Sequence, residues 1–226
     1  MSDYSCKTND PRKCGLMKSG VVSYENGLVL QARAKTLVAS GGWDGIVILL
    51  EHLPVITVGN GGGKENLRLN DAELSSKEIT VISANRGGNI TCHNPGQLIG
   101  YPVLNLVKWQ KDVHWYVHML EEVLIRTLAH YGFKAGRKSR YTGAWLADEK
   151  IAAIGVSVRR WITGHGFALN IHNNLGLFEA IVPCGISEFG VTNMIKQGLD
   201  VDVADVSDIF ITQFQKVFQC ELNLIA

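Results

Sequence analysis

The segment Pro183-Cys184-Gly185 sets one thiol between a rigid residue and a permissive one. Proline fixes φ just before the cysteine, and glycine lets the backbone turn or approach a ligand just after it. This arrangement is suited to presenting a nucleophile. A packed turn at the end of a strand is the alternative, because cysteine is among the most buried residue types. A lone cysteine is a candidate for catalysis only once partner groups are found.

The elements that must position this thiol can be read from the apolar pattern. The nearly continuous apolar run 45–52 predicts a strand covered on both faces, and segments 55–59, 78–83 and 98–104 predict further strands. Segments 143–147 and 150–158 flank Asp148-Glu149 as a β-hairpin, and 161–171 and 178–182 are expected to be extended. Helices are predicted from about 27 to 40, from an N-cap at Asp112 to about Tyr131, and from Asp202 onward. The fold class is therefore α/β (α+β), with a mixed, largely antiparallel sheet flanked by helices.

Two further patterns resemble functional motifs but lack required residues. The glycine-rich segment 59–66 lacks the first glycine and the final Ser or Thr of a phosphate-binding P-loop. His114 and His118 lie four residues apart on a predicted helix, but the glutamate of the zinc protease motif is absent between them. We therefore expect a mobile loop at 59–66 and solvated histidines on the helix.

Length, charge and cysteine content limit the class of protein. The 226 residues, 46% of them hydrophobic, suit one large domain with a sizeable core. Lys and Arg (22) nearly cancel Asp and Glu (21), so no general field draws the chain to nucleic acid or to anionic lipid. Five scattered cysteines without a CxxC pair disfavour a disulfide framework or a zinc knuckle and favour a reducing compartment.

The N-terminal segment contains aspartates and no apolar signal core. We expect a flexible tail over residues 1–19 and a single catalytic domain over residues 20–226. No apolar run approaches the ~18 residues that a membrane span requires. A cytoplasmic protein is expected.

Three stretches together resemble the lipoyl(octanoyl) transferases of lipoate biosynthesis. They agree in order and spacing, and the likeness extends from about Tyr24 to the final helix. The stretches are Arg86-Gly87-Gly88 with His93-Asn94-Pro95-Gly96-Gln97, residues 150–155 followed by 165–170, and Pro183-Cys184-Gly185. Cys92 is a departure, because an aromatic residue commonly stands before the histidine in this family. The resemblance implies a fold shared with the catalytic domains of lipoate and biotin protein ligases.

Carried across residue by residue, the resemblance implies that Cys184 is the acyl-thioester nucleophile and that Lys150 is the catalytic lysine. His52 and His165 are candidate supporting residues that either orient the substrates or are structural. The residues implied to contact the acyl substrate are Arg86, Gly87, Gly88, Asn89, Ile90, Thr91, Cys92, His93, Ala153, Ile154, Gly155, Gly166, Phe167 and Ala168. Without the resemblance, Lys150 would be read as a solvated lysine in a turn.

The implied roles suit the chemistry of these residue types. A free cysteine has a pKa near ~8.5, so a nearby cation such as a lysine is needed to favour the thiolate at neutral pH. A desolvated neutral lysine can in turn accept the proton of an attacking amine. Backbone N–H groups around Cys184-Gly185 or within 166–168 are candidate oxyanion donors. Burial of roughly six methylenes at ~0.8 kcal/mol each would hold an octanoyl chain.

The resemblance also implies the partners. The donor is octanoyl-acyl carrier protein, and the acceptors are lipoyl domains of 2-oxoacid dehydrogenases and the glycine cleavage H protein. No cofactor, metal, nucleic acid or membrane is expected, and the chain is expected to be a monomer. The basic residues Arg137, Lys138 and Arg140 form either a docking patch for the acidic carrier protein or a solvated loop. Two alternatives stay open: an ATP-dependent lipoate or biotin ligase, and a non-catalytic acyl-carrier-binding module.

Overall fold

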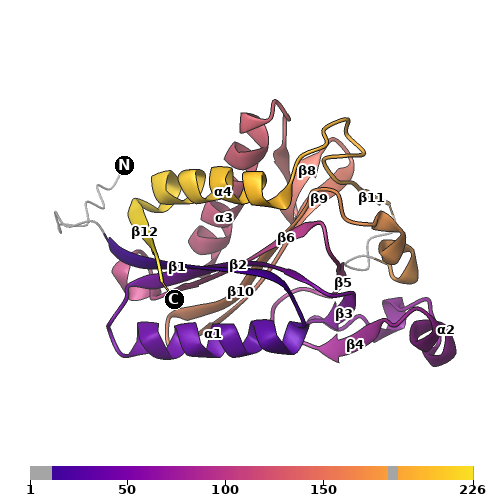
Figure 1. The fold of residues 1–226 in the computed structure, drawn as a ribbon, viewed down its shortest axis with the longest axis horizontal. Coiled ribbons are helices and arrows are strands. Elements are labelled where there is room, and N and C mark those ends of the chain that lie inside the picture. The colour runs from indigo at the N-terminus through magenta and orange to yellow at the C-terminus, as the bar shows by residue number, and fades with distance from the viewer. Residues whose placement is uncertain (1–11, 183–187, 226) are drawn as a thin grey trace.

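The computed structural model describes residues 12–182 and 188–225. Within these residues the strands form a nine-stranded sheet and a three-stranded sheet, with helices packed on both faces of the larger one (Figure 1). The elements are β1 (Arg12–Val22), α1 (Tyr24–Ala39), β2 (Gly45–His52), β3 (Val55–Val58), η1 (Lys64–Asn66), α2 (Asp71–Ser76), β4 (Thr80–Ser83), β5 (Ile90–His93), β6 (Gln97–Leu104), η2 (Leu106–Lys108), α3 (Val113–His130), β7 (Gly136–Lys138), β8 (Tyr141–Leu146), β9 (Glu149–Arg159), β10 (Ile162–Asn170), η3 (Leu175–Ala180), β11 (Gly190–Val191), α4 (Val203–Phe218) and β12 (Cys220–Leu224). The predicted α+β class is confirmed.

The large sheet has the order β12-β1-β2-β6-β10-β9-β8-β7, and β11 adds to β9. Its middle, from β2 through β6, β10 and β9 to β8, is antiparallel, whereas β12, β1 and β2 pair in parallel. The two central strands β2 and β6 are buried almost throughout, as their continuous apolar sequences predict. The small sheet, with the order β4-β3-β5, lies beside the end of α1 (Figure 1).

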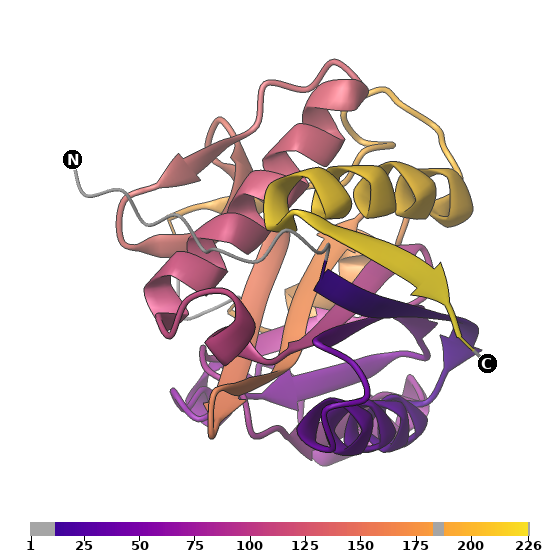
Figure 2. The ribbon, with the colours of Figure 1, turned by 90° about the vertical axis from the view of Figure 1, so that its left-hand side faces the viewer.

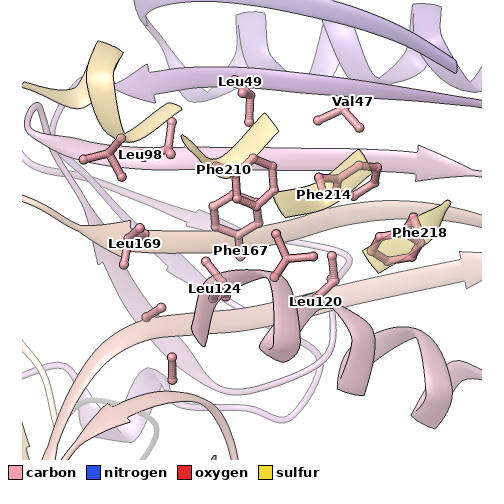
Figure 3. Close-up of a cluster of buried hydrophobic side chains, with 14 of the residues drawn as sticks. Val47, Leu49, Leu98, Leu120, Leu124, Phe167, Leu169, Phe210, Phe214 and Phe218 are labelled. Atoms are coloured by element: carbon pink, nitrogen blue, oxygen red, sulfur yellow. The ribbon is translucent and has the colours of Figure 1, made fainter. Parts of the chain in front are cut away.

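Helices α3 and α4 cover one face of the large sheet, and α1 covers the other (Figures 1 and 2). The larger apolar core fills the α3/α4 side. Phe210, Phe214 and Phe218 recur at helical spacing along α4 and stack on the sheet and on α3 (Figure 3). The ring of Phe167 from β10 joins this cluster, with its centroid 4.6 Å from that of Phe210. This side therefore carries most of the apolar packing.

The N-caps of two helices are formed by side-chain hydrogen bonds. The Asp112 carboxylate accepts hydrogen bonds from the backbone N–H groups of His114 (2.8 Å) and Trp115 (3.1 Å), which confirms it as the N-cap of α3. The Ser23 hydroxyl accepts a bond from the N–H of Asn26 at the start of α1. In α1, a Cβ added at Gly27 would come within 2.6 Å of Cε1 of His52. The missing side chain thus lets the helix lie directly on that ring.

Residues 12–19 do not belong to a flexible tail, which corrects the prediction. They form most of β1, which pairs with β2 on one side and with β12 on the other. Cys14, Gly15, Leu16 and Met17 are buried there. The apolar run is only four residues long and is flanked by lysines, so it gave a weak signal. Residues 1–11 lie outside the described part of the chain.

Two more elements differ from expectation. Residues 175–180 form the 3-10 helix η3 rather than an extended segment, and Ile181 then bridges to Leu67. The strand β12 follows α4 and was not predicted, although Cys220, Leu222 and Leu224 alternate with polar residues. Among the described residues, no helix combines the length and the apolar character needed to cross a membrane.

Candidate active site

A cavity of about 50 Å³ lies on the α1 side of the sheet and continues towards the small sheet. It brings together residues that are far apart in the sequence. Its lining residues are Tyr24, Arg86, Gly88, Asn89, Ile90, Thr91, His93, Ile99, Tyr101, Ala153, Ile154, Gly155, His165, Gly166, Phe167 and Ala168. Twelve of the fourteen residues predicted to contact the acyl substrate are in this set, together with His165.

A smaller cavity of about 20 Å³ contains Lys150 and shares Thr91, Ala153 and Ala168 with the larger one. The two cavities follow one another along β9, β10 and β6. The smaller cavity includes Lys150 of β9, Asn170 of β10 and Gln97 of β6, whereas the larger includes Gly155, Gly166 and Tyr101 of the same three strands. Together the cavities form one slot that runs along the strands, with Lys150 at one end. We call it the acyl slot.

Lys150 is half-buried near the start of β9. Its ammonium group lies 4.8 Å from the centre of the Trp145 ring, a cation–π distance. Its backbone carbonyl accepts a hydrogen bond from the N–H of Thr192 at 3.0 Å, and Val191 pairs with it in β11. The strand pairing on both sides fixes the backbone from which this side chain projects.

Cys184 lies outside the described residues, as do Pro183 and Gly185. The described chain on both sides of 183–187 reaches the end of the slot that holds Lys150. Phe178 of η3 and Val191 of β11 both line the smaller cavity. Val182, the last described residue before the gap, donates its N–H to the carbonyl of Asn66.

The Arg86 side chain is buried and supports the loop 84–89 through its hydrogen bonds. Its guanidinium donates two hydrogen bonds of 2.8 Å to Thr57, one to the carbonyl and one to Oγ1, and a third of 3.1 Å to the carbonyl of Gly87. Its side chain also packs beside Gly155, where an added Cβ would lie 3.2 Å from Cδ of Arg86. Arg86 therefore holds the loop against β3 and β9, and only part of its surface faces the slot.

Three buried histidines surround the slot, and burial keeps them neutral. Burial lowers the pKa of His93 to about 3 and that of His165 to about 4, and nearby cationic groups add to both effects. Burial also lowers the pKa of His52. Neutral rings cannot act as anion-binding groups at pH 7, so these histidines contribute hydrogen bonds rather than charge.

The neighbours of two of these rings identify their tautomers. Nδ1 of His93 lies 2.8 Å from Oε1 of Gln97, and the amide nitrogen of Gln97 donates to Oδ1 of Asn170 at 2.7 Å. Since an amide oxygen only accepts, His93 carries its proton on Nδ1. Nδ1 of His52 likewise faces the carbonyl of Val22 at 3.1 Å and carries the proton. In both rings Nε2 is therefore the acceptor.

Two residues predicted to contact substrate do not line the slot. Gly87 instead donates its N–H to the carbonyl of Val156 at 2.8 Å and ties its loop to β9. Cys92 is fully buried in the core of the small sheet, where its thiol approaches the carbonyl of Leu177, and burial raises the pKa of this thiol. His52 does not line the slot either, but it contacts Tyr101, which does.

Three residues that line the larger cavity, Tyr24, Ile99 and Tyr101, were not predicted from the sequence, and neither were Phe178 and Val191 of the smaller one. Tyr24 is the first residue of α1, and Ile99 and Tyr101 alternate along β6 on the same face. Because side chains alternate between the two faces of a strand, Ile99 and Tyr101 lie on the same face of β6 as Gln97, which belongs to the motif 93–97. This alternation could have identified both residues from the sequence. Phe167 belongs to a lining strand, but its ring packs against Phe210 in the opposite core (Figure 3).

Two secondary expectations change. Of the predicted oxyanion donors within 166–168, Phe167 and Ala168 lie between two paired strands, β6 and β9, so their backbone N–H groups face sheet partners and are poor candidates, whereas Gly166 pairs with β9 alone. Arg137 of the basic loop pairs with Glu121 at 3.0 Å and Glu122 at 2.8 Å, which neutralises much of the suggested docking patch.

Among the described residues, no group of three His, Cys, Asp or Glu side chains is arranged to hold a metal ion.

Residues 23–215 match the lipoyl protein ligase A/B catalytic domain, and the chain belongs to this family. Its fold is that of the lipoate ligases, because it resembles the bipartite lipoate protein ligase of Thermoplasma acidophilum with a TM-score of 0.76 over 95% of this chain and 88% of that one, at 16% identity. The biotin protein ligase of Aquifex aeolicus is more distant, with a TM-score of 0.52 over 93% and 70% of the two chains, at 12% identity.

Among sequence relatives, the octanoyltransferase of Thermoanaerobacter pseudethanolicus is 49% identical over 215 residues, which cover 95% of this chain and 94% of the relative. The octanoyltransferase of Clostridium kluyveri is 47% identical over 212 residues, or 93% and 91% of the two chains. The resemblance predicted from three short stretches is thereby confirmed, as is the expectation of a transferase enzyme.

Proposed function

We propose that this protein transfers an octanoyl group from octanoyl-acyl carrier protein to a lysine of a lipoyl domain, through a thioester on Cys184. The main support is the acyl slot itself. It is lined largely by apolar and backbone groups, has Lys150 at one end, and is reached at that same end by the described chain on both sides of residues 183–187. The identity of nearly half of the residues with octanoyltransferases supports the acyl group.

In the first half-reaction, the Cys184 thiolate attacks the carbonyl carbon of the donor thioester. A new C–S bond forms, the old C–S bond breaks, and the carrier leaves as a thiol after taking up a proton. The Lys150 ammonium favours the thiolate by its charge, and its position over the Trp145 ring keeps it among apolar groups, where charge interactions are strong. Because one thioester replaces another, the step needs no nucleotide.

In the second half-reaction, the acceptor lysine must lose a proton before its nitrogen can attack the acyl-enzyme. Lys150, which gave its proton to the departing carrier thiol in the first half-reaction, is now neutral and takes that proton at the end of the slot where we place the acyl carbonyl. A C–N bond forms and the C–S bond breaks. The second proton of the amine passes to the departing sulfur, so that Cys184 is regenerated as a thiol, which releases this proton to solvent before the next cycle. Backbone N–H groups at Cys184-Gly185 are the remaining candidates for stabilising the oxyanion.

The acceptors are proposed to be the lipoyl domains of 2-oxoacid dehydrogenases and the glycine cleavage H protein, with the enzyme acting as a monomer. Transfer by monomers requires only that the end of the slot near Lys150 be accessible to each carrier in turn. Sedimentation at working concentration together with transfer to each purified acceptor would examine both statements.

The central experiment is incubation of the purified protein with octanoyl-acyl carrier protein in the absence of ATP, followed by intact mass analysis. We expect an octanoyl adduct that hydroxylamine removes and that a lipoyl domain discharges. The Cys184→Ser variant should not form the hydroxylamine-labile adduct, whereas Cys220→Ala, which removes another buried thiol, should form it. Equal labelling of the Cys184→Ser variant would refute the proposed nucleophile.

The same assay separates the alternatives. An ATP-dependent ligase would load free octanoate only when ATP is present, and a non-catalytic carrier-binding module would bind octanoyl-acyl carrier protein without acquiring the acyl group. Neither alternative predicts discharge of a protein-bound thioester to a lipoyl domain.

A further inference from the structure

The acyl slot ends in a polar compartment at the end remote from Lys150. Along β9, β10 and β6, the residues beyond the shared alanines include Gly155, His165 and Tyr101. Tyr24 of α1 closes this end, with its ring parallel to that of His93 at 6.4 Å between centroids. An acyl group whose carbonyl lies at Lys150 therefore directs its far end towards two tyrosines and two histidines. Ile99 and Ile154 line the same cavity, so these four polar side chains lie within a largely apolar surface.

The Tyr24 hydroxyl is buried, and it has no hydrogen-bond partner within residues 12–182 and 188–225. The whole residue is only 3% exposed. A buried hydroxyl without a partner is rare and costly in a folded protein, so the group points to a ligand or a bound water. Burial raises the pKa of this hydroxyl, which keeps its proton available for donation.

Acceptors face the same compartment. His52 holds its proton on Nδ1, so its Nε2 accepts the hydroxyl proton of Tyr101 over 2.6 Å. The Tyr101 oxygen then keeps lone pairs to accept a bond from a ligand. Nε2 of His93 is also an acceptor. Its nearest described donor is the Thr57 hydroxyl, whose Oγ1 lies 3.4 Å away at the long end of the hydrogen-bond range and accepts a bond from Arg86.

The compartment thus offers one uncommitted donor, at Tyr24, and two acceptors, at Tyr101 and His93. A hydroxyl group matches this set because it donates and accepts at once. A carboxylate does not match, because it only accepts and has no proton for the acceptors at Tyr101 and His93. The Arg86 guanidinium in the same lining already donates to Thr57 and to Gly87. The cavity volume of about 50 Å³ leaves room for a few atoms of the size of a water oxygen.

We propose that the slot also accepts medium-chain acyl groups that bear a hydroxyl group at the end remote from the thioester, and that Tyr24 is the residue that selects for this hydroxyl. The inference rests on the proposed transferase function and extends its substrate class. In the octanoyl complex a water molecule takes the place of the hydroxyl. In the hydroxyacyl complex that water is displaced, and Tyr24, Tyr101 and His93 bind the hydroxyl directly.

The test compares kcat/KM for octanoyl- and 8-hydroxyoctanoyl-acyl carrier protein, with a lipoyl domain as acceptor. We expect the wild-type protein to use both donors within about tenfold of each other, whereas an apolar slot would discriminate against the hydroxyl by roughly 10- to 100-fold. The Tyr24→Phe variant should lower the ratio of hydroxyoctanoyl to octanoyl transfer by about tenfold, which is the value of one hydrogen bond. Circular dichroism and a melting curve establish that the variant is folded.

A matched variant is Tyr116→Phe. Tyr116 is also fully buried, but its hydroxyl donates to the carbonyl of Pro102 at 2.9 Å on the other side of the sheet. This variant loses a buried hydroxyl without touching the compartment, so the ratio should not move. If the ratio of hydroxyoctanoyl to octanoyl transfer changes equally in both variants, the cause is a general loss of packing in the protein, and the proposed role of Tyr24 is wrong.

Two outcomes separate this inference from the proposed function. If octanoyl is transferred but 8-hydroxyoctanoyl is used more than about tenfold less well, the compartment does not bind the hydroxyl, and the inference fails while the function stands. If neither group is transferred, calorimetry still measures the binding of free octanoate and 8-hydroxyoctanoate to the protein. Binding of the hydroxy acid that Tyr24→Phe weakens about tenfold supports the inference, and equal binding by both proteins overturns it.

Discussion

The Tyr101 hydroxyl lies 2.6 Å from Nε2 of His52, and Nδ1 of the same ring lies 3.1 Å from the carbonyl of Val22. The histidine thereby joins the end of β1 to the middle of β6, two elements that are not neighbours in the sheet. His52 is fully buried, so both ring nitrogens must find their partners within the protein.

Removing that hydroxyl should cost stability. In Tyr101→Phe, Nε2 of His52 is left buried without its donor, which should lower the free energy of unfolding by about 1–3 kcal/mol. For a chain of this size the melting temperature should fall by roughly 2–4 °C per kcal/mol. The control is Tyr131→Phe at a half-buried position on the far side of the sheet. Equal melting temperatures for the two variants would show that the bond to His52 contributes nothing to stability.

The neutral histidines predict a dependence of stability on pH. The folded-state pKa values of about 3 for His93 and about 4 for His165 lie below the ~6.5 of an unfolded histidine. Below pH 6.5 the unfolded state therefore binds more protons than the folded state, and the free energy of unfolding falls as the pH falls towards 4. Between pH 6.5 and pH 5, protonation of each of these histidines in the unfolded state should lower the free energy of unfolding by roughly 2 kcal/mol.

Urea unfolding of wild type and His165→Asn at pH 7 and pH 5 tests this. The loss of stability between the two pH values should be smaller in the variant by about 2 kcal/mol. His130→Asn is the matched control, since His130 is exposed near the C-terminal end of α3. An identical pH dependence in wild type and His165→Asn would mean that His165 is protonated in the folded protein.

Lys150 should be needed for transfer and not for folding. Lys150→Ala should reduce kcat/KM for octanoyl transfer by about 10²- to 10⁴-fold, the usual range for loss of a group that transfers protons. Lys138→Ala is a close control, because Lys138 also approaches the Trp145 ring, at 5.5 Å, yet does not line the slot. Similar losses in the two variants would point to disturbance of Trp145 rather than to a catalytic lysine.

The width of the slot at the shared alanines should limit the acyl chain. Ala153 lines both cavities, so Ala153→Leu places three extra carbons where the chain must pass. If about three methylenes are excluded at ~0.8 kcal/mol each, octanoyl transfer should fall roughly 50-fold. Transfer of a butanoyl group by the same variant serves as the internal control and should change little. Normal octanoyl turnover would show that the chain takes another path.

Much of this arrangement was accessible from the sequence where local signals are strong. The continuous apolar run of β2, the Asp112 cap of α3 and the hairpin of β8 and β9 were all predicted correctly. Twelve of the fourteen residues predicted to contact the acyl substrate line the slot, whereas Gly87 and Cys92 do not. These features depend on neighbouring residues in the chain, or on short spacings that a strand or helix fixes.

Features set by distant contacts were missed. β1 and β12 pair with each other across some two hundred residues of sequence, and no local pattern encodes this pairing. Tyr24 lines the slot only because Gly27 lets α1 approach His52. The ring of Phe167 turns to the opposite core because strand alternation, rather than membership of the motif, decides its direction.

The large sheet is a single layer, and the residues on its two sides differ in how much they can be changed. On the α3/α4 side, aromatic rings interlock and tolerate little change in volume. On the α1 side, Ala153, Gly155, Gly166 and Ala168 surround an unfilled slot. Combinatorial libraries restricted to the α1 side can therefore explore new acyl groups while inheriting an intact scaffold. In the lining strands β6, β9 and β10, neighbouring residues face opposite sides of the sheet, so only every second codon should be varied.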